Sequence, residues 1–402
     1  MMERRRVSRV LRVAAVAVAS GLAALACDGG AGGSGNVAIG LAGPLQLSYG
    51  RSMQNAAQMA AEEINAAGGI DGRRLELIIR DDGADPQRAI SIANEFVGNA
   101  SIVAVVGHIT SGATLAAAGI YNAPENGLLE LSPTASSPLI TEAGDWTFRL
   151  CPSDLEHGPA LAQWLRGRLG GRSANVLYAN DAYGRGVRES FVDAFVAQGG
   201  AVLGTDPFLP AYVAQDASFF DPFVERAILR RIDAIVVGGL APEAIEIIRS
   251  ARANGFGGRI LGADGLLGVE EAGAVAEGVF VSTPFLPDMP GERTQRFVAA
   301  YTERFGVAPD AYAALTYDGI HLVARAIREE GADREAVRDW IAAVGTGQPA
   351  YEGVTGRIAF DANGDVAEKP VVIGVVRGGA VVSADARATA MAAGAAEQVA
   401  AN

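Results

Sequence analysis

The stretch V-A-V-V-G-H-I-T-S-G-A-T, Val103–Thr114, decides the fold of this chain. A short apolar run ends at Gly107, a group of hydroxyls follows, and an apolar helical segment begins at Leu115. An apolar run that ends at a glycine and leads into a helix indicates a buried parallel strand. In open α/β sheets, ligands bind beyond the carboxyl ends of such strands. Because Thr110 and Ser111 fall there, at a helix N-terminus, we expect this turn to hold a carboxylate.

The alternation of strand and helix runs along most of the chain. Helices with one apolar face separate the apolar runs, and glycine or proline marks many of their ends. Two long helices are expected late in the chain, near Glu292–Phe305 and Pro309–Glu329. Strands are expected at 36–41, 75–80, 102–106, 128–131, 146–150, 175–179, 201–205, 234–237, 260–261 and 279–282. This cadence, which restarts near residue 153, predicts an α/β fold of two doubly wound parallel-sheet lobes.

The chain is expected to cross between the two lobes more than once, through a hinge of several strands. Lobe 1 is predicted to comprise 36–152 and 284–353, and lobe 2 to comprise 153–283 and 354–384. Ligands bind at domain interfaces and at strand ends. Both tendencies point to the cleft between the lobes.

The C-terminal region is expected to close the fold with a β-hairpin. Its strands are predicted at 356–360 and 370–376, with the turn at Asn363-Gly364. The alanine-rich tail from 385 to 402 has low complexity and is interpreted as frayed helix or disorder.

Residues 1–27 are expected to be a secretory signal peptide rather than part of the fold. Five arginines precede an apolar stretch that ends in small residues before Cys27. The run from Ala23 to Cys27 resembles a bacterial lipobox, whose cysteine becomes lipidated and N-terminal, although Ala24 replaces the usual leucine. A glycine-rich tether at 28–35 follows, which suits a lipid-anchored protein. The alternative is ordinary cleavage near Ala26, with Cys27 incidental.

Composition excludes several classes of protein. Of the 402 residues, 50% are hydrophobic and 20% are charged, as in a globular α/β protein, and the net charge of −13 disfavours nucleic acid and anionic membranes. His108, His157 and His321 lie far apart, and Cys27 and Cys151 show no metal-ligand spacing. We therefore expect no metal and no cofactor. His108 is expected to bond locally, and Cys151 to be a buried free thiol, although a disulfide to Cys27 is arithmetically possible.

An enzyme on a Rossmann-like sheet is the less favoured alternative. The sequence has no G-x-x-x-x-G-K-[ST], no G-x-G-x-x-G after the first strand and no G-x-S-x-G. We therefore expect a protein that does no chemistry on its ligand.

Several motifs, taken in order, resemble a known family. They are Ile39–Gly50, Asn65–Gly72, Gly107–Thr114, Leu131–Ser137, Phe148–Asp154 and Asn180–Gly186. From about residue 36 to 377 the chain resembles the periplasmic leucine/isoleucine/valine-binding proteins, the substrate-binding subunits of branched-chain amino-acid ABC transporters. The resemblance implies a type I periplasmic binding fold.

The resemblance also implies a set of ligand-binding residues. In that family, hydroxyls after the third and fourth strands hold the ligand's carboxylate, and the matching positions are Ser111 and Ser136. A backbone carbonyl matching Thr134 and an acid matching Asp264 hold the ammonium group, and Tyr183 matches a tyrosine of the cleft.

Four more positions are expected to complete the site. They are Tyr49, Thr110, Ala135 and Leu240. Leu240 is a departure, because the family has an aromatic residue near Gly238-Gly239. The departure reshapes the side-chain pocket and leaves the identity of the solute open.

Each site residue also has an ordinary structural interpretation. Ser111 can cap a helix, Ser136 can be a loop hydroxyl, and Asp264 before a glycine can be a plain turn. Tyr183 can belong to the core. These alternatives stay open on the sequence alone.

The sequence thus predicts an exported, lipid-anchored, monomeric binding protein. It is expected to capture an amino-acid-like solute and present it to an ABC transporter permease, touching the membrane only through its anchor. A sensor that reports the same solute to a receptor or regulator is the alternative.

Overall fold

The computed structural model describes residues 36–213, 216 and 218–385. The predicted signal peptide (1–27), the tether (28–35) and the lipidation of Cys27 lie outside the described residues. So does the tail beyond residue 385.

The first sheet has five parallel strands in the order β2-β1-β3-β4-β5. Its elements are β1 (Val37–Gly43), α1 (Ser48–Ala66), β2 (Leu75–Asp81), α2 (Pro86–Gly98), β3 (Ile102–Gly107), α3 (Ser111–Tyr121), β4 (Leu129–Ser132), η1 (Pro138–Glu142) and β5 (Thr147–Arg149). Every residue of β3 is buried, as its continuous apolar run predicts. Because the chain runs from β1 outward to β2 and then returns to β3, the sheet's switch point lies between β1 and β3.

The second sheet has seven strands in the order β14-β13-β10-β9-β8-β6-β7. Its elements are α4 (Asp154–Gln163), η2 (Trp164–Arg168), β6 (Ser173–Ala179), α5 (Ala182–Ala197), β7 (Ala201–Phe208), α6 (Pro210–Val213), α7 (Asp221–Leu229), β8 (Ala234–Gly238), α8 (Ala241–Ala253), β9 (Arg259–Gly262), η3 (Asp264–Leu266), η4 (Val269–Ala276), β10 (Phe280–Thr283), β13 (Val372–Arg377) and β14 (Ala380–Ser383). Strands β7-β6-β8-β9-β10 repeat the order of the first sheet, so the two predicted doubly wound sheets are both present.

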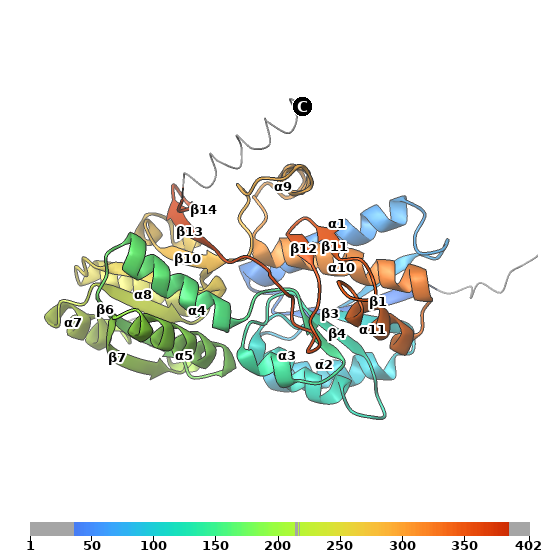
Figure 1. Cartoon of the computed structure of the whole chain (residues 1–402), viewed down its shortest axis with the longest axis horizontal. Coiled ribbons are helices and arrows are strands. Elements are labelled where there is room, and N and C mark those ends of the chain that lie inside the picture. Colours follow the sequence, from blue (N-terminus) through green and yellow to red (C-terminus); the bar gives the residue numbers. More distant parts are fainter. Residues whose placement is uncertain (1–35, 214–215, 217, 386–402) are drawn as a thin grey trace, which may run out of the picture. The chain divides into compact units, whose positions relative to one another are not determined.

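The remaining elements belong to the same half of the molecule as the first sheet, where α10 and α11 contact the sheet and α9 contacts α1. They are α9 (Glu292–Phe305), α10 (Ala311–Glu330), α11 (Arg334–Ala342), β11 (Tyr351–Gly353) and β12 (Gly356–Ile358). Helix α10 packs along α1 and against β3, while α2 and α3 pack against each other (Figure 1). We call the elements built on the five-stranded sheet lobe 1 and those built on the seven-stranded sheet lobe 2.

The predicted C-terminal hairpin is wrong. Strand β12 pairs antiparallel with β11, whereas β13 pairs with β10 and β14. The backbone N–H groups of Val354 and Thr355 donate to the carboxylate of Asp318 in α10, which keeps this segment with lobe 1. The turn itself is present, because Phe360 faces Val366 in an isolated antiparallel bridge. A pattern of alternating apolar residues identifies strands but does not choose their partners.

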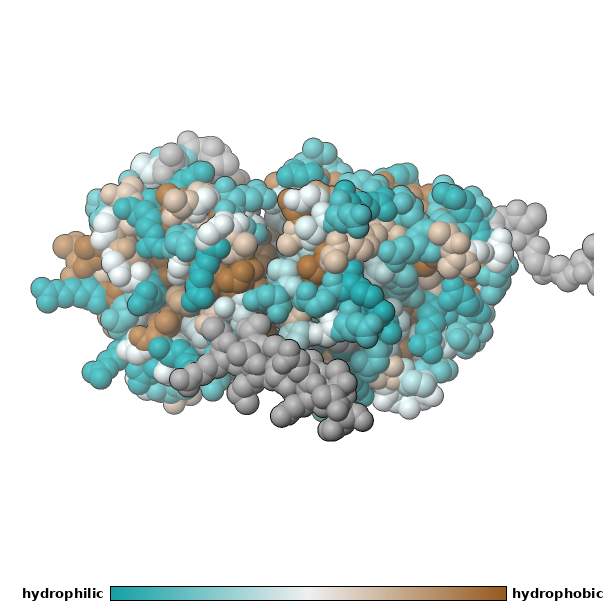
Figure 2. All heavy atoms as spheres, turned by 90° about the horizontal axis from the view of Figure 1, so that it is seen from above, coloured by the Kyte–Doolittle hydropathy of each residue, from teal (hydrophilic) through white to brown (hydrophobic). Residues whose placement is uncertain are grey.

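Figure 2 shows hydrophilic residues spread over one face, with small apolar patches between them. Among the described residues, no helix combines the length and apolar character that a membrane crossing requires.

Candidate functional site

The turn after β3 depends on Gly107. Its φ is +126°, and a Cβ there would stand 2.2 Å from the carbonyl oxygen of Ala42 in β1. Only glycine tolerates both conditions. Beyond it, the His108 carbonyl accepts hydrogen bonds from Thr114 Oγ1 at 3.0 Å and from Ser132 Oγ at 2.5 Å. The turn is therefore fixed to both α3 and β4.

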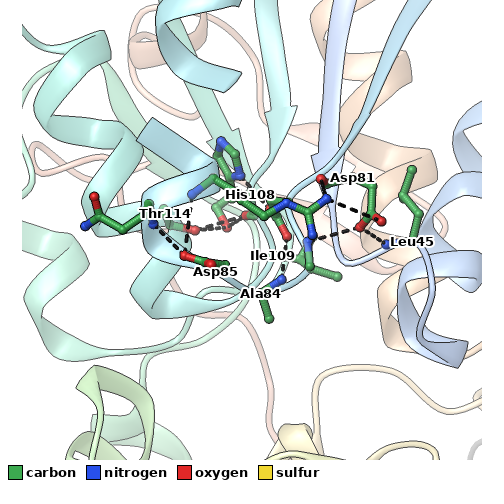
Figure 3. Close-up of polar contacts among 12 residues, drawn as sticks. Leu45, Asp81, Ala84, Asp85, His108, Ile109 and Thr114 are labelled. Carbon is green, nitrogen blue, oxygen red and sulfur yellow. Dashed lines mark hydrogen bonds and ion pairs between the residues drawn. The ribbon is translucent and has the colours of Figure 1, made fainter. Parts of the chain in front are cut away.

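His108 also anchors the turn through its side chain. Its Nδ1 lies 2.6 Å from Oδ2 of Asp82, and both side chains are fully buried. Asp82 in turn accepts the N–H of Ala84 at 2.8 Å. Figure 3 shows His108 and Ile109 near Ala84 and the turn that follows β2. The predicted local role of His108 is confirmed.

The turns after β3 and β4 are bonded to each other. Ser111, the first residue of α3, accepts the N–H of Ser137 on its Oγ at 3.2 Å. Thr134 Oγ1 donates to the carbonyl of Ile109 at 2.9 Å. Ser111 is thus not the helix cap, because Thr110 occupies that position and its side chain makes no cap bond.

Two hydroxyls of lobe 1 remain available. The buried Oγ1 of Thr110 and Oγ of Ser136 have no hydrogen-bond partner of standard geometry in the described part of the chain. Ala135, which precedes Ser136 in the turn after β4, is fully buried. Together with the N-terminal N–H groups of α3, these hydroxyls make a donor-rich end suited to an anion.

Arg149 holds the turn after β4 through its guanidinium group. Sequence reasoning did not identify this residue. Its Nη1 donates to the carbonyls of Ser136 at 3.1 Å and Ser137 at 2.9 Å. Its Nε lies 2.7 Å from Oδ1 of Asp365, and the arginine is 1% exposed. The sequence signal that could have identified it was the presence of an arginine within the apolar predicted strand 146–150.

Lobe 2 contributes a buried acid. Asp264 begins η3 directly after β9 and is 4% exposed. Its Oδ1 accepts the hydroxyl of Tyr183 at 3.1 Å, and that hydroxyl accepts the N–H of Gly265 at 2.8 Å. Burial raises the pKa of Asp264, and the nearby His157 and the Tyr183 hydroxyl partly oppose the rise. The structure therefore brings Tyr183 and Asp264 together.

Two further polar residues of lobe 2 were missed. Asp154 and His157 lie in the first turns of α4 and are fully buried. His157 Nδ1 lies 2.9 Å from Ser282 Oγ, while its Nε2 has no partner in the described ranges. Burial raises the pKa of Asp154 and lowers that of His157, and the charge of Asp264 raises both. Ser153 caps this helix, because its Oγ accepts the N–H of Leu155 at 3.3 Å.

Tyr49 in α1 and Tyr312 in α10 form an aromatic pair. Their ring centroids are 5.1 Å apart. Burial raises the pKa of each hydroxyl, and the charge of Asp264 adds to the rise at Tyr312. Tyr49 was predicted, whereas Tyr312 was not. Tyr49 also lines a cavity of about 630 Å³, together with Leu267 from lobe 2.

Leu240 is half-buried at the start of α8. The carbonyl of the preceding Gly239 is 2.8 Å from the place where a Cβ of residue 265 would stand, so this loop lies against the Asp264 turn. Leu240 packs against two clusters of buried apolar residues, one of which lies wholly in lobe 2.

Direct bonds join the two halves. Ser137 Oγ donates to the carbonyl of Ala182 in α5 at 3.1 Å. The N–H of Asp154, at the start of α4, donates to the carbonyl of Ser136 at 2.8 Å. The halves therefore face each other, with donors on lobe 1 and a buried acid on lobe 2. This arrangement suits a zwitterion.

Within the described residues, no group of three or more His, Cys, Asp and Glu side chains is placed to hold a metal ion. Cys151 is a buried free thiol, as predicted.

Comparisons with known proteins identify the family of this chain. Residues 37–380 match the family described as periplasmic binding protein. An amino acid binding protein from Pseudomonas aeruginosa is 29% identical over 346 residues, which cover 84% of this chain and 89% of that protein. The Leu/Ile/Val-binding protein homolog 1 of Brucella suis is 30% identical over 334 residues, covering 82% of this chain and 86% of that protein.

A solved structure shows the same fold. It is the branched-chain amino acid transporter substrate-binding protein of Streptococcus pneumoniae in complex with isoleucine. Its TM-score is 0.79 at 28% identity, over 87% of this chain and 98% of that one. The predicted fold of two doubly wound lobes is confirmed.

Proposed function

Because the chain belongs to the periplasmic binding protein family, we propose that it captures an amino-acid-like solute and delivers it to an ABC transporter. The relatives described above are amino-acid-binding proteins, and one is solved with isoleucine. Family membership also indicates export to the periplasm.

One observation carries the proposal. Buried hydroxyls that lack partners among the described residues lie at the end of lobe 1, and the buried Asp264 lies in lobe 2. Leaving buried polar groups unpaired is costly, at about 1–3 kcal/mol each. A zwitterion relieves this cost at both ends, since its carboxylate accepts from the hydroxyls and its ammonium group donates to Asp264.

The role of each residue follows from this arrangement. We assign the carboxylate to Ser111, Ser136 and the N–H groups of α3, with Thr110 beside them. The ammonium group is assigned to Asp264 and the carbonyl of Thr134. Tyr183 orients the acid through its hydroxyl.

Closure of the lobes is the expected response to the solute. A ligand that touches both halves gains contacts in the closed state that the open state cannot provide. The permease can then distinguish the loaded protein from the empty one by its closed conformation. No chemistry on the solute is proposed.

The solute's side chain is less constrained than its head group. Leu240 stands where the related family has an aromatic residue, which leaves a differently shaped wall. The proposal therefore covers branched-chain and other amino acids, amides and small carboxylates.

We also propose that Cys27 carries a lipid anchor. Labelling of cells with a fatty-acid analogue should mark the wild-type chain and not Cys27→Ala. Equal labelling of both would contradict the anchor and leave the solute-binding proposal intact.

A thermal-shift screen followed by calorimetry tests the main proposal. A ligand at a hundred times its dissociation constant stabilises by about 2.7 kcal/mol, which a melting curve resolves. We expect one-to-one binding of at least one amino acid. Failure of all amino acids, amides and small carboxylates to bind would overturn the proposal.

A further inference from the structure

The amino edge of the lobe 2 sheet carries a concentration of positive charge. Strands β6, β8 and β9 are neighbours in this sheet, and the segments 164–172, 229–233 and 252–259 lead into them. These segments hold seven arginines and one acid, Asp233, although the whole chain has a net charge of −13. A local excess of one sign attracts ligands of the opposite sign. Because Asp264 follows the other end of β9, the proposed function does not use this edge.

Two of these arginines line a cavity of about 490 Å³. They are Arg231, two residues after α7, and Arg259, the first residue of β9. Both are exposed, and neither guanidinium group has a hydrogen-bond or ion-pair partner among the described residues. A guanidinium group is a rigid fork of N–H donors that matches the geometry of a carboxylate or a phosphate. The cavity therefore presents two such forks that the described part of the protein leaves unused.

The backbone of Arg231 adopts a conformation that favours glycine. Its φ is +53°, in the left-handed region. The N–H of Arg231 donates to the carbonyl of Ile228, and that of Ile232 donates to the carbonyl of Ala227, a pattern in which glycine usually ends the helix. Helix α8 ends in the same way, with Gly255 at φ +75° on the wall of the same cavity. An arginine kept in a strained conformation indicates a role for its side chain.

Glycines and apolar residues form the rest of the cavity. Gly257 lines it, and a Cβ there would meet no atom within 4 Å, so no protein atom covers that side of the backbone. The N–H groups of Gly257 and Gly258 have no hydrogen-bond partner within the described ranges. Phe256 and Leu165 are buried and close the interior of the cavity. Guanidinium groups beside free backbone N–H groups are donors that proteins use to hold phosphate.

Asp233 is the one acid that lines this cavity, and the protein already satisfies it. Its Oδ2 accepts the N–H of Arg172 at 2.8 Å. The same oxygen accepts the N–H of Ser173 at 2.9 Å and its hydroxyl at 3.0 Å. The carboxylate is thus bonded to the start of β6 and forms no ion pair with Arg231 or Arg259, whose charges remain available to a ligand.

We propose that this cavity is a second binding site of the protein, for a phosphate group. The phosphate oxygens accept hydrogen bonds from the guanidinium groups of Arg231 and Arg259 and from the N–H groups of Gly257 and Gly258. The phosphate belongs either to a small molecule in solution or to a lipid headgroup, which share this chemistry. The inference is independent of the amino-acid solute, because the cavity lies at the other edge of the sheet.

Calorimetry of the purified full chain with inorganic phosphate, at constant ionic strength, tests the site in solution. Where the phosphate comes from solution, we expect one-to-one binding that Arg231→Gly/Arg259→Ala weakens about tenfold or more, because hydrogen bonds to a charged group are lost. Arg231→Gly alone should weaken binding while the melting temperature stays equal or rises, because glycine adopts the left-handed backbone without strain. A loss of binding that comes with a lower melting temperature would make Arg231 a structural residue and overturn the inference.

Arg74→Ala is the matched control. Arg74 is an exposed arginine directly before β2, at the amino edge of the lobe 1 sheet, as Arg259 is at that edge of lobe 2. Its removal lowers the positive charge of the chain without touching the cavity, and binding should be unchanged. An equal loss in this variant would show attraction by overall charge rather than a site, and would refute the proposal.

Co-sedimentation with vesicles separates the two sources of phosphate. The full chain is mixed with vesicles of phosphatidylglycerol or of phosphatidylcholine, so that an anchoring lipid contributes equally to both. If a lipid headgroup is the ligand, binding to phosphatidylglycerol exceeds binding to phosphatidylcholine, and the excess disappears in Arg231→Gly/Arg259→Ala but not in Arg74→Ala. If the ligand is a soluble phosphate, only calorimetry shows binding. Absence of binding in both assays, or a double variant that behaves like the wild type in both, would overturn the inference.

Discussion

In lobe 1 the turns after β3 and β4 hold each other through neutral hydrogen bonds, whereas the facing part of lobe 2 gathers buried acids. Ser111 accepts from Ser137, and Thr134 donates to Ile109. Asp264 instead has one bond from a tyrosine and a raised pKa. The first half is built to keep its shape in the absence of solute, and the second is built to gain from the solute's charge.

This difference suggests that the two halves of the site have separate roles in binding. Shape and donors come from lobe 1, where the two turns are bonded to each other while the hydroxyls of Thr110 and Ser136 stay available to a ligand. Negative charge comes from lobe 2, whose buried acids bond to no cation among the described residues. Changes in the first half should cost stability or modest affinity, whereas changes in the second half should cost affinity and alter its pH dependence.

The largest effect is expected at the foundation of lobe 1. His108→Leu removes the partner of the fully buried Asp82 and should lower the free energy of unfolding by about 3–5 kcal/mol. Denaturant unfolding measures it. The double variant His108→Leu/Asp82→Asn should recover part of the loss, because the buried charge is then gone. A loss under about 1 kcal/mol in the single variant would contradict the role of this pair.

The second largest effect is expected at the acid of lobe 2. Asp264→Ala leaves the ammonium group without its charged partner and should weaken binding of an amino acid about 100-fold or more, since breaking a buried charge contact costs about 2–5 kcal/mol. Calorimetry with the amino acid and with an uncharged analogue measures it. Equal losses for both solutes would refute the ammonium role.

A smaller loss is expected at the carboxylate end. Ser111→Ala removes one hydroxyl donor and also the acceptor of the Ser137 N–H, and should weaken binding about tenfold, as one hydrogen bond to a charged group is worth about 1.5–3 kcal/mol. Ser153→Ala, at the half-buried N-cap of α4, is the control and should leave affinity unchanged. If Ser111→Ala binds like the wild type, the carboxylate assignment fails.

The smallest effect is expected at the tyrosine that orients the acid. Tyr183→Phe removes the hydroxyl that donates to Asp264, so the pKa of Asp264 should rise further. Binding needs the ionised acid, and affinity is lost as the pH falls through that pKa. We expect a loss of a few-fold near pH 7 that grows at lower pH. A pH profile parallel to the wild type would argue for a purely structural tyrosine.

Much of the fold could be predicted from local patterns. The apolar run of β3, the glycine at 107 and the restart of the cadence after residue 150 all correspond to elements of the structure. Helix α9 has the predicted limits, Glu292–Phe305. These features depend on the conformational preferences of residues that are neighbours in the sequence, so the sequence is enough to predict them.

Other features could not be predicted, for physical reasons. Nothing in the repeat pattern distinguishes Asp154 from a solvated first-turn acid, because its burial depends on α5 and on Ser136 from other parts of the chain. Tyr312 reaches the site only because α10 packs along α1. Strand partners after residue 350 depend on which sheet edge remains open.

By itself, the sequence determined the alternation of strands and helices, the turn at Gly107 and the family to which the motifs point. Those are consequences of local periodicity and backbone conformation. Only the tertiary structure decided that the Ser111 hydroxyl bonds to the neighbouring turn while the Ser136 hydroxyl does not, and that Asp154 and Asp264 are buried. Hydrogen-bond partners and burial depend on residues distant in sequence, so the packed chain alone assigns them.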